Sequence, residues 1–151
     1  MSWKRTIWLK TFHKICKMNK AIMWFEKHEK LSVLITLLIA AAIFFISSIS
    51  FDNVKYSIGP LSIIYHFSAF FMLAFFLSIS LVKGKNKNTK LLIVVFLLAV
   101  AYGILDEIHQ YFVPGRYSDL FDVGINSLGI LYALMTYMIS LKVRNRKSSN
   151  F

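Results

Sequence analysis

Residues 91–122 decide the fold of this chain, and they read LLIVVFLLAVAYGILDEIHQYFVPGRYSDLFD. The segment from Leu91 to Val113 is long enough to cross a bilayer, because a helix needs ~20 residues to span about 30 Å of hydrocarbon. Pro114 and Gly115 then break the helix, and another apolar segment follows. Four of the seven acidic residues of the chain lie here, although charged groups at membrane depth are costly and often functional.

Three other apolar segments have a similar length, and each one ends at charged or turn-forming residues. The hydrophobic share of 57% and the mean hydropathy of +0.59 are higher than in ordinary soluble domains. Pro60 suits the first turn of a helix and marks the start of one segment. We therefore predict an all-α fold, an integral membrane bundle of four transmembrane helices that span about 31–50, 60–82, 91–113 and 120–141.

The basic residues predict the orientation of this bundle. Sixteen of the eighteen Lys and Arg residues lie in residues 1–30, in the 83–90 loop and after residue 141; the other two are Lys55 and Arg116. Four spans place these three segments on one side, which the positive-inside rule makes cytoplasmic. We expect a multi-pass protein of the cell membrane with both termini cytoplasmic. No nucleic-acid partner is expected, because the charge follows the loops instead of covering one folded face.

The chain divides into three predicted regions. Residues 1–30 form a basic amphipathic helix suited to an anionic leaflet, residues 31–141 form the membrane domain, and residues 142–151 form a basic cytoplasmic tail. A single cysteine excludes an intrachain disulfide. The apolar side of the N-terminal helix is expected to carry Trp8, Phe12, Ile15, Cys16, Ile22 and Met23, and its basic side Lys10, Lys14, Lys17 and Lys20.

Polar residues form two stripes around the Pro114-Gly115 turn. Gly103, Glu107 and Gln110 share one helical face, since residues spaced by three or four lie together. The next helix carries Asp119, Asp122, Asn126 and Gly129 on one face, with Arg116 between the two helices. His66 lies ~9 Å along its helix from Pro60, at a rise of ~1.5 Å per residue, and Glu107 has a similar depth. We therefore expect a polar site at the outer membrane face, formed by His66, Glu107, Gln110, Arg116, Asp119, Asp122 and Asn126.

Three interpretations of this site stay open. The groups could form a structural network in which Arg116 pairs with Asp119 or Asp122, and Glu107 with Gln110 or His66. They could instead bind or transform a polar headgroup, with Glu107, His66 and Asp122 as the catalytic candidates and Arg116 as an anion anchor.

A metal bound by His66, Glu107 and Asp122 is the third interpretation. No short ligand motif supports it, so we predict no metal, and the sequence does not identify a cofactor. Asp106 points ~100° away from Glu107 around the helix, and we place it with His109 at the periphery of the site.

The stretch resembles the VanZ-like family of membrane proteins in the pattern G-x-x-x-E-x-x-Q, then P-G-R-x-x-D-x-x-D-x-x-x-N-x-x-G, which covers residues 103–129. His66 and the four-span layout also fit the family, over about residues 31–141, and the N-terminal segment is placed outside the resemblance. Two positions depart from the family: Ile63 stands where a lysine is common, and Ala133 where a glycine is common.

The resemblance implies a role in the cell envelope, because the family is named after a protein that lowers susceptibility to teicoplanin, a lipidated antibiotic. It implies no reaction. We expect either glycopeptide or lipopeptide tolerance or the binding of a lipid, lipid-linked or lipopeptide headgroup at the outer leaflet. A membrane-embedded enzyme and a structural or partner-binding subunit are the alternatives, and an oligomer stays open.

Overall fold

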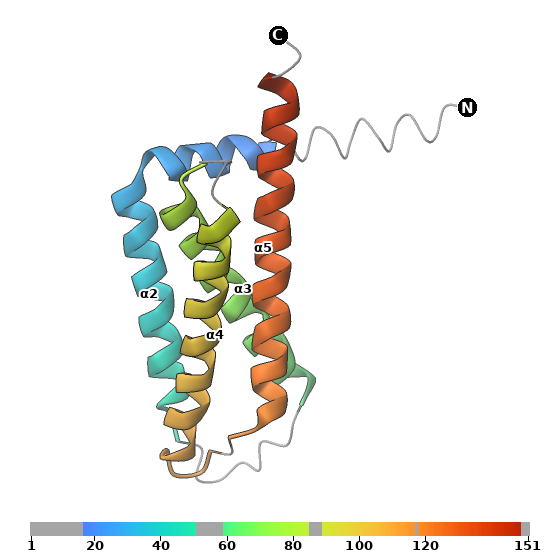
Figure 1. Ribbon diagram of the computed structural model, residues 1–151. Helices are drawn as coiled ribbons and strands as arrows, with labels where there is room; N and C mark the ends of the chain where they lie inside the picture. Colours follow the sequence, from blue (N-terminus) through green and yellow to red (C-terminus); the bar gives the residue numbers. More distant parts are fainter. Residues whose placement is uncertain (1–16, 51–58, 85–88, 117, 149–151) are drawn as a thin grey trace, which may run out of the picture.

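The computed structural model describes residues 17–50, 59–84, 89–116 and 118–148. Every regular element within these ranges is a helix: a short N-terminal helix over residues 17–27, then α2 (Glu29–Ser47), α3 (Pro60–Val82), α4 (Thr89–Tyr111) and α5 (Leu120–Ser148). The four longer helices have the length and apolar composition needed to cross a membrane. The predicted all-α bundle of four spanning helices behind an N-terminal helix is confirmed (Figure 1).

The helix boundaries agree with the sequence except at the end of α5. Helix α3 begins at Pro60, whose missing N–H and fixed φ suit the first turn. Helix α5 continues to Ser148, although its apolar segment was expected to end at Leu141. Lys and Arg end a membrane span but are good helix formers, so the helix runs beyond the hydrocarbon without interruption.

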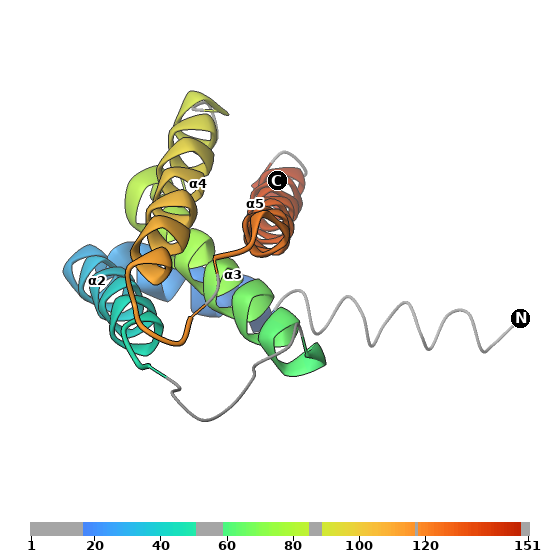
Figure 2. The ribbon, with the colours of Figure 1, turned by 90° about the horizontal axis from the view of Figure 1, so that it is seen from below.

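Helix α3 is the central element of the bundle. It packs against α2, α4 and α5, whereas α2 and α5 do not pack against each other over the residues described here. An end-on view shows α3 running obliquely between the other three (Figure 2). It approaches α5 closely at Gly129, where a Cβ atom would lie only 2.4 Å from the carbonyl oxygen of Phe67. Gly129 therefore allows the two backbones to touch, as small residues do between membrane helices.

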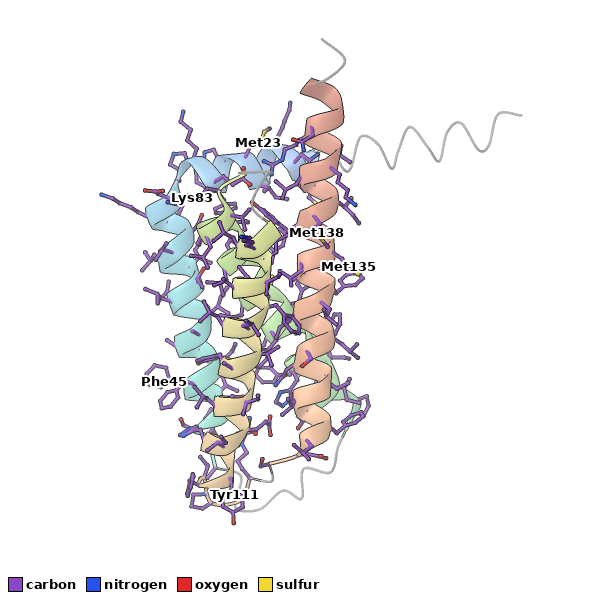
Figure 3. The ribbon with its side chains drawn as sticks, viewed as in Figure 1. Met23, Phe45, Lys83, Tyr111, Met135 and Met138 are labelled. Carbon is purple, nitrogen blue, oxygen red and sulfur yellow. The ribbon has the colours of Figure 1, made fainter. Side chains whose placement is uncertain are left out.

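The bundle is apolar outside and partly polar inside. Phe45 is 68% exposed and Met135 is 54% exposed, and both point away from the bundle (Figure 3). Several serine and threonine hydroxyls, by contrast, are buried, and Thr36 Oγ1 of α2 lies 3.3 Å from Ser80 Oγ of α3. This distribution suits a bilayer, where apolar side chains face lipid and polar groups find partners inside the protein.

The N-terminal helix crosses one end of the bundle (Figure 1). Ile22 is buried in the core, and Phe25 packs edge to face on Phe76 of α3. Met23, on the same expected apolar side, is exposed. Ile22 therefore faces the bundle, and the expected contact of the apolar side with the leaflet stays a prediction. The expected apolar residues Trp8, Phe12, Ile15 and Cys16 lie outside the described residues, as do Lys10 and Lys14.

A charged network anchors this helix to α5. The Arg144 guanidinium donates two hydrogen bonds to the Glu26 carboxylate, of 2.6 and 2.9 Å. The Tyr137 hydroxyl donates to the same carboxylate at 2.7 Å and accepts the Gly84 N–H at 3.1 Å. The sequence signal for this network is that Glu26 is the only acidic residue among the first 28.

Candidate functional site

The turn between α4 and α5 positions the polar residues at the opposite end of the bundle from the N-terminal helix (Figure 1). Tyr111 marks this end and Lys83 the other (Figure 3). Gly115 has a φ of +76°, a left-handed conformation that favours glycine. Asp119 then caps α5, because its Oδ1 accepts the N–H of Phe121 at 2.9 Å. The left-handed turn at Gly115 and the cap at Asp119 allow the chain to reverse direction here. Helix α5 therefore runs back alongside α4.

Glu107 of α4 faces the start of α5. Its Oε2 accepts the backbone N–H of Asp119 at 3.2 Å, and the residue is only 4% exposed. Its Oε1 is buried and has no hydrogen-bond partner among the described residues. A buried carboxylate oxygen without a partner is unfavourable by itself, so this atom is available to a ligand.

His66 of α3 lies between two side chains of α5. Its Nδ1 is 3.1 Å from Oδ1 of Asn126, and its Nε2 is 3.6 Å from Oδ2 of Asp122. Because an amide oxygen can only accept, Nδ1 carries the proton and donates to Asn126. Nε2 is therefore the atom that His66 presents to the carboxylates.

Asp106 lies inside the site, and the expectation that it is peripheral is wrong. Asp106 is 5% exposed, and its Oδ2 accepts a 2.9 Å hydrogen bond from Nε2 of Gln110. The same Gln110 nitrogen lies 3.4 Å from Ser47 Oγ of α2, so Gln110 does not pair with Glu107 as the stripes suggested. The prediction failed here because α4 packs against three helices, α2, α3 and α5. Two adjacent sides of α4 are therefore buried, instead of the single side that the stripes suggested.

Arg116 fastens the turn to α2. Its guanidinium donates to the carbonyl oxygens of Ile46, at 2.5 Å, and Ile49, at 3.0 Å. A cation is favourable at the carbonyl end of a helix, where the last acceptors lack partners within it. Arg116 was expected to pair with an aspartate or anchor an anion; these bonds give it a structural role between α2 and the turn.

Three ligand-type side chains converge inside the bundle. His66, Asp106 and Glu107 each offer one atom, and these atoms all lie within 4.8 Å of one another. Asp122 approaches His66 as well. We call His66, Asp106, Glu107, Gln110, Asp122 and Asn126 the buried polar cluster; all six residues are buried.

Three further buried polar atoms of the described residues, two of them in the buried polar cluster, are without partners. Among the described residues, Oδ1 of Asp122, Nδ2 of Asn126 and the hydroxyl of Tyr65 are buried and make no hydrogen bond. Gly103 lies beside the cluster, since a Cβ there would be 3.5 Å from Nδ2 of Asn126. Buried polar atoms are usually satisfied, so several such exceptions are unusual for a complete structural network.

The sequence missed the contribution of α2. Besides Ser47, Ser48 joins the site's edge, where its Oγ lies 2.9 Å from Nε2 of His109. His109 itself stacks on Phe44, with ring centroids 4.6 Å apart, which agrees with its expected peripheral place. The run Ser47-Ser48 at the end of an apolar segment was the only available signal.

The fold and the site together define a multi-pass membrane protein with an ionisable cluster buried near one end of its helices. More particularly, the chain belongs to the VanZ/LLP1 family, whose sequence model matches residues 2–141. The N-terminal segment is thus part of the family match, and the expectation that the resemblance begins near residue 31 is wrong. Among curated proteins and among solved structures, none matches the chain.

Proposed function

We propose that the protein acts in the cell envelope, where the buried polar cluster binds the polar headgroup of a membrane amphiphile at the outer leaflet. The amphiphile is a lipid, a lipid-linked precursor or a lipopeptide, and its capture contributes to glycopeptide or lipopeptide tolerance. The observation that carries this proposal is the unpartnered Oε1 of Glu107, buried beside the Asp122 carboxylate and the Asn126 amide of the same cluster. The family membership supports the envelope role.

The charge of the cluster limits what it binds directly. Asp106, Glu107 and Asp122 contribute three carboxyl groups, and His66 is the only basic side chain among the six residues. Unpaired buried charge is strongly unfavourable, so the cluster favours a cation or a group rich in N–H and O–H donors. A bare phosphate is disfavoured, because Arg116 already donates to the α2 carbonyl oxygens.

The position of the cluster supports a ligand that comes from the membrane. It lies at the end of the bundle away from the lysine-rich segments, which the positive-inside rule assigns to the cytoplasm. His66 is more than one helical turn from Pro60, the first residue of α3. A headgroup could therefore reach the cluster while its acyl chains stay beside the exposed apolar side chains of the helices.

The test compares variants that change charge without changing shape. Glu107→Gln and Asp122→Asn are expected to accumulate in the membrane and to abolish teicoplanin tolerance in a susceptible bacterium that expresses the chain. Glu29→Gln is the matched control, since this carboxylate is exposed and pairs with Lys83 at the other end of the bundle. Full tolerance in both cluster variants at wild-type levels would overturn the proposal, and loss of both proteins from the membrane would favour a purely structural cluster.

An enzyme acting on the same headgroup is the second candidate. It is favoured by the placement of His66, whose Nδ1 is held by Asn126 while Nε2 faces Asp122. A general base needs such an oriented nitrogen or carboxylate within reach of the proton it removes. Turnover of a purified lipid-linked substrate that is lost in His66→Gln would support the enzyme, whereas binding without turnover would support a binding protein.

A further inference from the structure

We propose that His66, Asp106 and Glu107 bind a divalent transition-metal ion, with Asp122 supplying a further carboxylate beside it. This inference concerns the same cluster as the proposed function but does not need the envelope role. The sequence predicted no metal, because it offered no short ligand motif, and the three ligands weighed there were His66, Glu107 and Asp122. The fold brings the three residues together from two helices, α3 and α4.

The geometry is close to that of a bound ion. Ligand atoms at ~2.1 Å from a shared ion lie at most ~4.2 Å apart. The candidate atoms of His66, Asp106 and Glu107 lie within 4.8 Å of one another. Side-chain movements of a few tenths of an ångström would therefore close the site around an ion, without any change in the helices.

The charges also favour a positive partner. Ionised together, the three carboxyl groups would outnumber one imidazolium, and buried charges in proteins are paired or coordinate metals. Oε1 of Glu107 and Oδ1 of Asp122 are buried and without a hydrogen-bond partner in the described part of the chain. A cation within the cluster would satisfy these oxygens and offset their repulsion in one step.

Asn126 completes the arrangement behind His66. A metal-bound histidine usually donates its other ring N–H to a fixed acceptor, which sets its tautomer and orientation. Oδ1 of Asn126 provides that acceptor for Nδ1, which leaves the lone pair of Nε2 for the ion. Asn126 is 1% exposed, so no solvent competes for this bond.

The ligand set selects among divalent ions. Mg²⁺ and Ca²⁺ prefer oxygen ligands alone, whereas an imidazole nitrogen with carboxylates suits Zn²⁺ or Mn²⁺. Zn²⁺ is expected to bind more tightly than Mn²⁺, following the general order for such sites. The ion would keep one or more positions for water or for the headgroup of the proposed function, since the cluster supplies few protein ligands.

The experiment measures metal binding to the purified full chain in dodecylmaltoside micelles. After chelator treatment, equilibrium dialysis with Zn²⁺ or Mn²⁺ is expected to show one bound ion per chain, with Zn²⁺ tighter and Mg²⁺ a poor competitor. Zn²⁺ should also raise the melting temperature, because an ion that binds only the folded state stabilises it. Wild-type protein that binds no stoichiometric ion and gains no stability would overturn the proposal without any variant.

Variants then locate the ion. His66→Gln, Asp106→Asn and Glu107→Gln are expected to lose most of the binding, and Asn126→Leu to weaken it by about 10- to 100-fold, as for other residues behind a metal ligand. His109→Gln is the matched control and should bind as the wild type does. Unchanged binding in folded Asp106→Asn and Glu107→Gln would overturn the proposal and assign the ion to surface histidines. Lost binding with intact teicoplanin tolerance would instead reject the envelope role of the cluster and leave the metal site standing.

Discussion

Nδ1 of His66 lies 3.1 Å from Oδ1 of Asn126, a contact that joins the central helix α3 to α5 across 60 residues of sequence. The contact fixes which histidine nitrogen faces the three carboxylates. It also means that Asn126 acts through His66, because its side-chain oxygen is directed at the imidazole ring. Asn126 is therefore a positioning residue of the site, and its substitution has a defined structural effect.

The first prediction concerns this contact. Asn126→Leu should lower the free energy of unfolding by about 1–3 kcal/mol, because the buried Nδ1–H of His66 loses its acceptor. Denaturant titration in micelles measures the change. Ser127→Ala is the control: its hydroxyl bonds to Val123 of its own helix, so its loss should change stability by less than about 1 kcal/mol. Equal effects of the two substitutions would contradict the role given to Asn126.

The second prediction concerns the contact between α3 and α5. Gly129→Ala places a methyl group 2.4 Å from the Phe67 carbonyl oxygen, so the helices must separate. Overpacking of this kind costs about 1–3 kcal/mol. Gly124→Ala is a matched control in the same helix, because nothing lies within 4 Å of the added carbon, and there alanine should be neutral or stabilising. Thermal unfolding of the two variants in micelles tests this, and greater damage from Gly124→Ala would contradict the packing described.

The third prediction concerns the network that holds the N-terminal helix. Glu26→Gln removes the charge opposite Arg144, whose guanidinium makes two hydrogen bonds to the carboxylate. Glutamine keeps one acceptor oxygen and loses the other. A hydrogen bond to a charged group contributes about 1.5–3 kcal/mol, so we expect destabilisation in the range of one lost bond. Glu29→Gln breaks an exposed pair with Lys83 and should cost less than about 1 kcal/mol. Denaturant titration of both variants measures these changes in the free energy of unfolding. A larger loss of stability in Glu29→Gln than in Glu26→Gln would contradict the prediction.

The fourth prediction concerns orientation. In a Cys16→Ser background, Ser118→Cys should react with a membrane-impermeant maleimide added to intact cells, because this exposed residue lies in the α4–α5 connection. Lys142→Cys, exposed near the other end of the bundle, should react only after the membrane is permeabilised. The reverse labelling pattern would contradict the membrane orientation that the lysine distribution predicts.

The four helices could be predicted from the sequence, because an apolar run of membrane length and a proline such as Pro60 at a helix start are both local signals. The sequence also selected His66, Glu107, Asp122 and Asn126, whose helical spacing placed them on faces that do meet. The prediction failed where the partners of a side chain depended on how many sides of its helix pack against other helices. Gln110 reaches Ser47 of α2 and also binds Asp106, and no local pattern indicates that α4 packs against three helices. Likewise, the bonds of Arg116 to Ile46 and Ile49 involve main-chain acceptors, which leave no signature in side-chain identity.

The contacts of the N-terminal helix have a consequence for the order in which the protein assembles during synthesis. Asn19 accepts a hydrogen bond from Ser140, 121 residues later, and Glu26 binds Arg144, 118 residues later. At ~5–20 residues per second, on the order of 10 s separate the synthesis of these partners. The helix over residues 17–27 must therefore wait, without these partners of Asn19 and Glu26, until α5 has been made. Closure of this end therefore requires that α5, the last of the four spans described, has already been made.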